Sequence, residues 1–207
     1  MGLAIQQSKV PRSELFITTK IPVGANASAV EATIEYDLAQ LMVSQVDLLL
    51  IHTPGKSAAD IATTWATMEA ALAAKKTRAI GVSNFVTSTL EALLKTANVV
   101  PAVNQISFSI GKVDSATIAY CKSKAITIEA YSPLGHTGAP VLKLPAVTKI
   151  AAAHNKSAAA VALRYIVQSG HSFVTASGES AYDKEDLALF DWSLTTSEMA
   201  TLDHQKH

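Results

Sequence analysis

Short apolar runs alternate with longer amphipathic segments along the whole chain. Each short run is rich in β-branched residues and lacks regular polar alternation, which is typical of strands buried on both faces of a parallel sheet. Such strands belong to parallel sheets that helices cover. Six of them are predicted: LFITTKI (15–21), VDLLLIH (46–52), RAIGVSN (78–84), AVNQISF (102–108), ITIEAYS (126–132) and HSFVTAS (171–177).

The longer segments have the periodicity of helices that bury one face. In the first of them, Val30, Ile34 and Leu38 share a face, Ser28 is the expected N-cap, and Glu31 would complete a capping box. Helices are predicted over residues 28–43, 63–76, 88–96, 114–124, 144–154, 157–170, 182–190 and 196–205.

The order of these elements predicts an α/β fold, because strict alternation of strand and helix gives parallel strands joined by right-handed crossovers. No low-complexity linker divides the chain, so residues 1–207 are expected to form a single domain. Two architectures compete, an open doubly wound sheet and a (β/α)8 barrel. No G-x-G-x-x-G motif follows the first strand, which weakens the open sheet.

Polar residues close four of the predicted strands: Lys20, His52, Asn84 and Tyr131. In a barrel the carboxyl ends of the strands meet at one face, where active sites are built, so this pattern favours the barrel. Taken singly, His52 could also be an ordinary polar residue that ends a buried strand, and Lys20 a surface lysine. Only six strands are found, so the predicted barrel is incomplete.

Composition narrows the class of protein. Half of the residues are hydrophobic, and Lys plus Arg balance Asp plus Glu at 17 each, so neither a nucleic-acid surface nor a basic membrane face is predicted. No apolar run is long enough to span a bilayer, no secretory signal is expected, and the single Cys121 excludes an intrachain disulfide. We expect a cytoplasmic protein without nucleic-acid or membrane partners.

Six short motifs occur in a characteristic order: FITTKI, DLLLIHTP, AIGVSNF, VNQISF, AYSPLG and LFDWSLTTSEMATLD. Together with TWATMEAALAAKKTRAIGVSNF they resemble the aldo-keto reductase family from about residue 3 to residue 203. The resemblance implies a (β/α)8 TIM barrel that reduces aldehydes and ketones with a nicotinamide cofactor, usually NADPH. This family does not bind that cofactor in a Rossmann fold, which agrees with the missing glycine motif.

The resemblance also implies a catalytic tetrad of Asp, Tyr, Lys and His, in which Lys20 and His52 occupy the lysine and histidine positions. A tyrosine with an ordinary pKa of about 10 becomes a usable proton donor when an ammonium beside it favours the phenolate. A neutral imidazole can hydrogen-bond the substrate carbonyl and fix its direction. His136, His154, His171, His204 and His207 show no ligand spacing, and no metal site is predicted.

Further residues would hold the cofactor, as the resemblance implies. Ser83, Asn84 and Gln105 would hydrogen-bond the nicotinamide carboxamide, and Tyr131 would stack on the nicotinamide ring. The following loop would wrap the pyrophosphate through its backbone N–H groups and one hydroxyl, and a serine after the last strand would reach a phosphate oxygen; these residues are Ser132, Leu134, Gly135 and Ser177.

The chain departs from the family pattern in two ways that affect chemistry. The family's Asp and Tyr lie before the lysine, but the 19 residues before Lys20 contain neither, so the first two strand–helix units are expected to be missing. The family often has Lys and Arg around the 2′-phosphate of NADPH, and here Ala176 and Tyr182 take those positions. The resemblance implies NADP as the cofactor, and these two replacements make NAD the alternative.

These departures leave several functions open. The first is an NAD(P)H-dependent oxidoreductase acting on a small carbonyl substrate, in a truncated family member whose catalytic competence is in doubt. The alternatives are a non-catalytic cofactor-binding or interaction protein, or a fragment of a complete reductase. The open edges of the first and last strands would also allow self-association.

Overall fold

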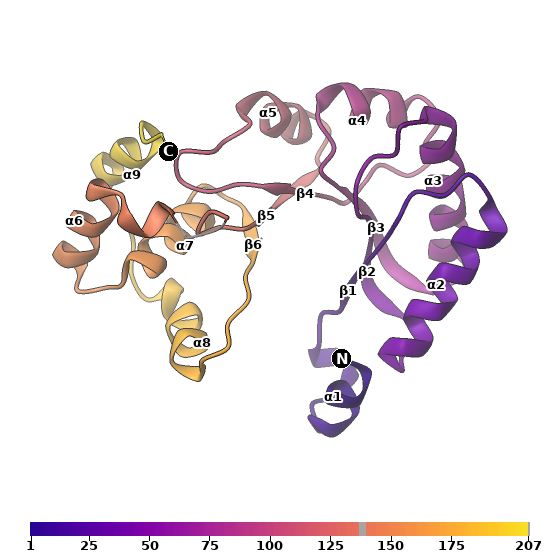
Figure 1. Ribbon diagram of the computed structural model, residues 1–207, viewed down its shortest axis with the longest axis horizontal. Helices are drawn as coiled ribbons and strands as arrows, with labels where there is room; N and C mark the ends of the chain where they lie inside the picture. The colour runs from indigo at the N-terminus through magenta and orange to yellow at the C-terminus, as the bar shows by residue number, and fades with distance from the viewer. Residues whose placement is uncertain (137–139, 207) are drawn as a thin grey trace. The chain divides into compact units, whose positions relative to one another are not determined.

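The structure, a computed structural model, describes residues 1–136 and 140–206 (Figure 1). The strands are β1 (Thr18–Ile21), β2 (Val46–Ile51), β3 (Thr77–Ser83), β4 (Val103–Ser107), β5 (Thr127–Tyr131) and β6 (Ser172–Val174). The α-helices are α1 (Gly2–Gln7), α2 (Ala27–Leu41), α3 (Ala58–Ala73), α4 (Thr87–Leu94), α5 (Ser115–Ser123), α6 (Pro145–His154), α7 (Ala158–Gln168), α8 (Ser180–Leu187) and α9 (Thr196–Asp203). Short 3-10 helices are η1 (Arg12–Glu14), η2 (Pro140–Lys143) and η3 (Ala188–Phe190).

The strands follow one another in the sheet in chain order, from β1 to β6. The pairs β1–β2, β2–β3 and β5–β6 are parallel, and a helix follows each strand. This confirms the predicted α/β fold of the (β/α)8 type with six parallel strands in the described part of the chain. β1 and β6 are the end strands of this order.

The chain divides into two compact units. Unit 1 consists of Met1–Asn104 and Ala119–Thr127, and unit 2 consists of Gln105–Ile118 and Ile128–His207. Strands β4 and β5 each contribute residues to both units. The expectation of a single domain remains a prediction.

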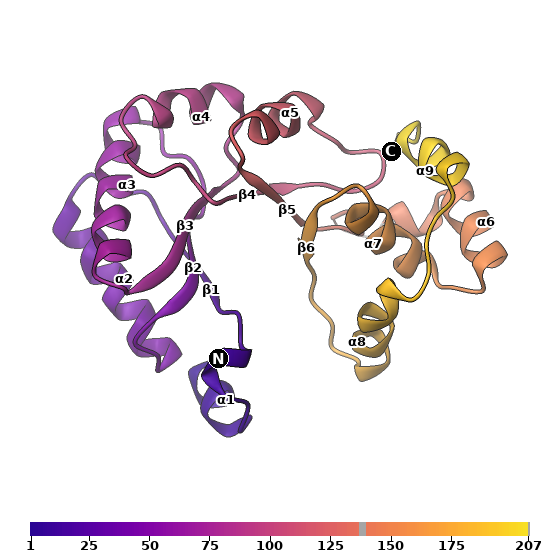
Figure 2. The same ribbon diagram turned by 180° about the vertical axis from the view of Figure 1, so that it is seen from behind.

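In unit 1, the three strands β1 to β3 lie beside α2 and α3 (Figures 1 and 2). Every residue of β2 is buried, as expected for a strand covered on both faces. Leu50 lies opposite Lys20 of β1 and Gly81 of β3. A Cβ atom on Gly81 would lie 2.6 Å from the carbonyl oxygen of Val103, so the close approach of that backbone requires glycine.

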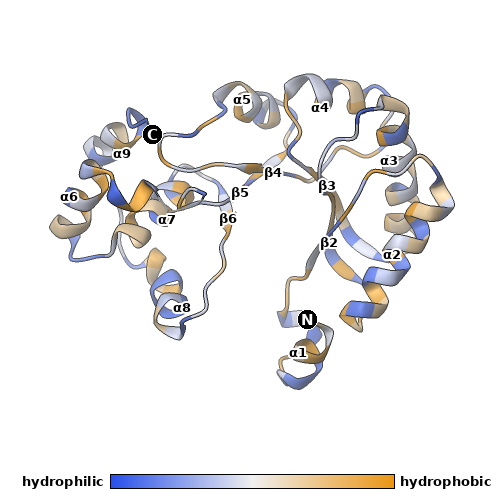
Figure 3. Ribbon diagram, in the orientation of Figure 1, coloured by the Kyte–Doolittle hydropathy of each residue, from blue (hydrophilic) through white to orange (hydrophobic). Residues whose placement is uncertain are grey.

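Helix α2 shows how local chemistry sets an element boundary. Hydrophobic and hydrophilic residues alternate along it (Figure 3), and Val30, Ile34 and Leu38 are buried as predicted. The predicted Ser28 cap is wrong: Asn26 is the N-cap, and its side-chain oxygen accepts a hydrogen bond from the Ser28 N–H at 2.9 Å. Asn26 has the extended backbone that a cap needs, whereas Ser28 already lies in the first helical turn.

In unit 2, β5 pairs with β6, with Glu129 opposite Ser172 and Tyr131 opposite Val174. Helix α7 lies beside β6 (Figure 2), and its buried residues Ala160 and Leu163 pack with Leu189 of η3. Leu134, Phe173 and Trp192 cover this cluster. None of the described helices has the length and apolar character that crossing a membrane would require.

Candidate active site

Two predicted catalytic residues lie at the carboxyl ends of neighbouring strands in unit 1. Lys20 is the third residue of β1, and His52 directly follows β2. The His52 N–H donates to the carbonyl oxygen of Ile21 at 2.9 Å, which continues the ladder between the two strands. The sheet register therefore holds both residues at one end of the strands.

The end of β3 adds two predicted cofactor residues at the same level. Ser83 is buried, and Asn84 has a φ of 64°, a left-handed conformation that asparagine tolerates better than most residues. The Asn84 Nδ2 donates to the His52 carbonyl at 2.9 Å and to Ser83 Oγ at 3.1 Å. Within unit 1, hydrogen bonds join His52, Ser83 and Asn84, and Lys20 lies at the same end of the adjoining strand.

In unit 2, Gln105 and Tyr131 lie on adjacent elements of the sheet. Gln105 is 1% exposed, and its Nε2 donates to Glu129 Oε1 at 2.6 Å. Tyr131 ends β5, two residues after Glu129, so the two side chains share a face of that strand. The Tyr131 ring meets His136 edge-on, with 6.1 Å between ring centroids.

A tight turn follows Tyr131. The Gly135 N–H donates to the Ser132 carbonyl at 2.9 Å, and both residues have a positive φ, 85° and 51°. A Cβ at position 135 would lie 2.8 Å from the Pro140 ring, so this position requires glycine. The turn directs Leu134 onto the α7 cluster.

The predicted residues Leu134 and Ser177 meet in one pocket of unit 2, with a volume of about 470 Å³. Ligand pockets in proteins commonly have volumes of about 300–1,000 Å³. Leu142 and Leu163 add apolar side chains to the lining of this pocket. Ser177 itself turns toward Glu179, donating to its carbonyl oxygen at 2.9 Å.

Acidic residues line this pocket. Glu185 and Asp186 contribute carboxylates, and none of the described residues that line it is Lys or Arg. Burial raises the pKa of Asp186, and the nearby carboxylates of Asp183 and Glu185 raise it further. Glu185 Oε1 accepts a hydrogen bond from the Ser157 N–H at 3.2 Å. The pocket is therefore unfavourable for an additional anion.

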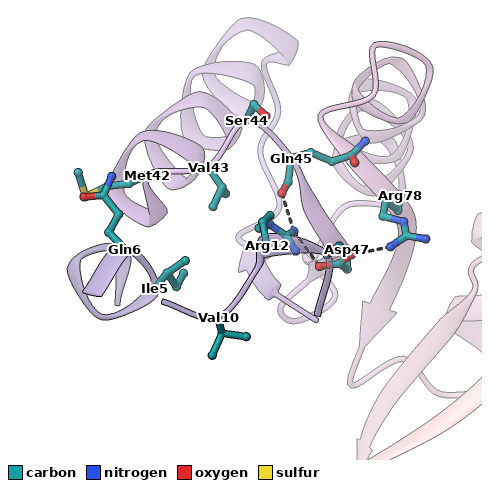
Figure 4. Close-up of a pocket in the computed structure, with 11 residues that line it drawn as sticks. Ile5, Gln6, Val10, Arg12, Met42, Val43, Ser44, Gln45, Asp47 and Arg78 are labelled. Carbon is teal, nitrogen blue, oxygen red and sulfur yellow. Dashed lines mark hydrogen bonds and ion pairs between the residues drawn. The ribbon is translucent and has the colours of Figure 1, made fainter. Parts of the chain in front are cut away.

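A second pocket, of about 660 Å³, lies at the opposite, amino-terminal ends of the unit 1 strands (Figure 4). Asp47, 3% exposed, accepts hydrogen bonds from Arg12 at 2.8 Å and Arg78 at 3.1 Å. Burial alone would raise the pKa of Asp47, but bonds from the Ile17 N–H and the two guanidinium groups outweigh it and lower the pKa. In barrels this end serves stability rather than chemistry.

Two further histidines make contacts outside the candidate site. His154 Nε2 lies 2.9 Å from Glu198 Oε1, and His171 meets Phe108 edge-on at 5.4 Å. His207 lies outside the described residues. Within residues 1–136 and 140–206, His, Cys, Asp and Glu side chains form no group of three that could hold a metal ion.

Sequence reasoning missed two acidic residues of the candidate site. Glu129 was not singled out, although its spacing of two from Tyr131 places both on one strand face. Glu185 was also missed, although it lies three residues after Tyr182 on the same helix and therefore on the same side. These spacings in the sequence could have identified both residues as part of the candidate site.

Parallel strands in chain order, with Lys20, His52 and Asn84 at their carboxyl ends, define a protein of the (β/α)8-barrel class. The chain belongs to the aldo/keto reductase family, NAD(P)-dependent oxidoreductases, whose family model matches residues 1–206.

Known members of the family support this assignment. The chain is 37% identical over 204 residues to the glyoxal reductase of Bacillus subtilis. This alignment covers 98% of this chain and 72% of that protein. It is 37% identical over 209 residues to NADPH-dependent codeinone reductase 1-4 of Papaver somniferum, covering 91% of this chain and 65% of that protein. The crystal structure of an aldo/keto reductase from Brucella melitensis superposes with a TM-score of 0.92 at 30% identity, covering 98% and 77% of the two chains. The chain thus spans about two thirds to three quarters of these relatives.

Proposed function

We propose that this chain binds NAD(P)H in the cytoplasm and forms part of an oxidoreductase that reduces small aldehydes and ketones to alcohols. Because the residues before Lys20 include neither the family's Asp nor its Tyr, we expect these 207 residues alone to turn over slowly or not at all. The observation that carries the proposal is the position of Lys20, His52 and Asn84 at the carboxyl ends of three adjoining strands in a member of this family. One relative is named an NADPH-dependent reductase and another a glyoxal reductase, which supports carbonyl chemistry.

The cofactor, when bound, supplies the hydride. Ser83, Asn84 and Gln105 are the proposed contacts of its carboxamide, and Tyr131 offers a ring face to the nicotinamide. For the phosphates and the adenosine portion, the proposed contacts are Ser132, Leu134, Gly135 and Ser177. The pocket that contains Leu134 and Ser177 has the apolar wall and polar rim that a nucleoside needs, so the residues present fit this part of the group.

Hydride addition to a carbonyl builds negative charge on oxygen, so catalysis requires donors at that oxygen. In the proposed site His52 donates a hydrogen bond that orients the carbonyl, and Lys20 supplies positive charge beside it. General acid catalysis contributes typically about 10²–10⁴-fold. The family's tyrosine is the usual acid, and the 19 residues before Lys20 contain neither Tyr nor Asp.

The acidic pocket supports a finer proposal about cofactor choice. The 2′-phosphate of NADPH adds about two negative charges. A charge-assisted hydrogen bond contributes about 1.5–3 kcal/mol, and neither Ala176 nor Tyr182 supplies the cation that the family often places beside this phosphate. We expect NADH to bind at least as tightly as NADPH. Titration of the chain with each cofactor, followed by nucleotide fluorescence, measures this directly.

Matched variants separate the two contributions to cofactor choice. Ala176→Lys should strengthen NADPH binding about tenfold and leave NADH binding nearly unchanged, because it adds one ion pair to the phosphate. Asp186→Asn should shift the preference in the same direction by removing repulsion. A wild-type chain that binds NADPH a hundredfold tighter than NADH would contradict the proposal and indicate that another cation, such as Lys184, replaces the missing ones.

The same titration tests the function as a whole. Micromolar binding of either nucleotide, weakened tenfold or more by Asn84→Ala, would support the proposed site. Absence of binding to both nucleotides would rule it out for this chain. A second candidate is that these 207 residues bind the cofactor without catalysis, since the residues before Lys20 include neither Tyr nor Asp. It predicts binding without turnover of a small aldehyde.

A further inference from the structure

Glu129 is a carboxylate on the same strand face as the proposed nicotinamide contact Tyr131. Along β5 the residues Ile128 and Ala130 are buried, whereas Glu129 and Tyr131 are partly exposed on the other face. The Glu129 carboxylate accepts a hydrogen bond from Gln105 Nε2 at 2.6 Å, a short distance for such a bond. Gln105 is buried, so this partner has little competition from water.

The contact fixes which end of the Gln105 amide faces Glu129. An ionised carboxylate can only accept hydrogen bonds, so it must face the NH₂ group of the glutamine and not its carbonyl oxygen. A glutamine amide without such a partner can turn over, because its two ends have nearly the same shape. With Glu129 in place, Oε1 of Gln105 occupies the other position of the amide.

We propose that Glu129 is a positioning residue for the cofactor: it holds Gln105 so that Oε1 accepts a hydrogen bond from the NH₂ group of the nicotinamide carboxamide. The proposal rests on the function proposed above, which assigns Gln105 to the carboxamide. Glu129 thereby selects one orientation of the carboxamide and of the ring that carries it, without touching the cofactor.

The test compares NADP⁺ with its 3-acetylpyridine analogue, in which a methyl group replaces the carboxamide NH₂. Affinities are measured by isothermal titration, with the NAD⁺ pair in parallel. The wild-type chain should bind the natural cofactor about fivefold more tightly than the analogue, the factor contributed by one ordinary hydrogen bond. Because both ligands share all other groups, their ratio isolates the carboxamide contact.

Variants at position 129 should change this ratio. Glu129→Lys reverses the polarity of the partner, because an ammonium donates to Oε1 and turns the Gln105 NH₂ toward the ligand; the preference should fall to about onefold. Glu129→Gln, which keeps the size of the side chain and can present either end, should give an intermediate ratio. In the double variant Gln105→Glu/Glu129→Gln the donor and acceptor are exchanged between the two positions, and the preference should return.

Thr127→Lys is the control, because position 127 lies two residues earlier on the same face of β5 and receives the same ammonium group; its net charge change is +1, against +2 for Glu129→Lys. It should alter both affinities equally and leave their ratio at the wild-type value. An unchanged ratio in Glu129→Lys and Glu129→Gln would overturn the proposal. If neither nucleotide binds the wild-type chain, the proposed function itself fails, and this outcome is distinct from a ratio that does not respond.

Discussion

The two arginines that contact the buried carboxylate of Asp47 contribute unequally to the stability of the fold. Arg12 donates to Asp47 Oδ2 and also to the carbonyl oxygens of Leu15 and Gln45, so it joins its own segment, which leads into β1, to the start of β2. Arg78, by contrast, is 67% exposed and makes a single 3.1 Å contact to Asp47. An exposed ion pair contributes little, because water and salt screen it. The stabilisation therefore resides mainly in the carboxylate, Arg12 and the Ile17 N–H.

We predict that Asp47→Asn lowers the free energy of unfolding by about 3 kcal/mol at pH 7, as expected when one partner of a buried pair is removed. Arg78→Gln should cost less than about 1 kcal/mol. Urea denaturation followed by circular dichroism measures both. Equal losses in the two variants would contradict this division.

The lowered pKa of Asp47 adds a pH dependence to this prediction. The folded chain holds the carboxylate ionised to lower pH than the unfolded chain, so the stabilisation is present at neutral pH. It is lost as the pH falls through the lowered folded pKa, where protonated Asp47 resembles asparagine. The difference between the wild type and Asp47→Asn should therefore shrink in acid.

At the scale of elements, Glu198 both caps helix α9 and joins it to helix α6. Glu198 completes a capping box with Thr195, accepting the Thr195 N–H at 2.8 Å, while the Glu198 N–H donates to Thr195 Oγ1. The same carboxylate contacts His154 at the end of α6. Such a cap stabilises the start of the helix, and the histidine contact joins α9 to α6.

Glu198→Ala should destabilise the chain by about 1–2 kcal/mol, because it removes both the cap and the contact with His154. Burial raises the pKa of Glu198, but the Thr195 N–H and His154 outweigh it and lower the pKa. Its stabilisation is thus present at neutral pH and fades as the pH falls through the folded pKa.

Glu198→Gln is the control for the cap, since glutamine can still accept the Thr195 N–H, and it should lose less than half as much stability. Hydrogen exchange of the α9 amides reports the local effect. Unchanged protection of α9 in Glu198→Ala would show that apolar packing of Leu202 alone holds the helix.

At the scale of the whole molecule, the position of the catalytic residues can be tested separately from catalytic activity. His52 and Lys20 can orient and polarise a carbonyl, but neither is the phenol that donates a proton in this family. We predict that the 207-residue chain reduces model aldehydes slowly or not at all. Addition of a segment with the family's first two strands, including their Asp and Tyr, should raise turnover by about 10²-fold or more.

His52→Ala provides the discriminating measurement. It should reduce turnover in the extended protein and change almost nothing in the 207-residue chain, as followed by oxidation of NADPH or NADH at saturating aldehyde. Rapid turnover by the 207-residue chain that depends on one of its own tyrosines would contradict this prediction and identify a different proton donor.

We also expect that copies of the chain can associate through the two end strands of the sheet. β1 and β6 end the strand order, and an edge strand presents backbone N–H and C=O groups to other chains. Pairing between copies through these edges remains a prediction, which sedimentation at increasing concentration would test.

The sequence by itself determined the class of fold, the order of the six strands and the helices that follow them, and the family; helix α1 (Gly2–Gln7) was not predicted. Uninterrupted apolar strands such as Val46–Ile51 are stable only where both faces are covered, so their pattern predicts a parallel sheet without knowledge of any contact. Lys20, His52 and Asn84 were predicted as strand-end residues for the same reason, because the end of an apolar run is visible in the sequence.

Only the tertiary structure decided which side chains share a partner. The contact of Glu129 with Gln105 joins residues 24 positions apart, and the contact of Asp47 with Arg12 joins residues 35 positions apart. The cap of α2 was also decided there: both Asn26 and Ser28 are good capping residues, and only the backbone conformation at Asn26 selects between them. Periodicity assigns a residue to a face, but a hydrogen-bond partner depends on strand register and helix packing, which the linear pattern does not specify.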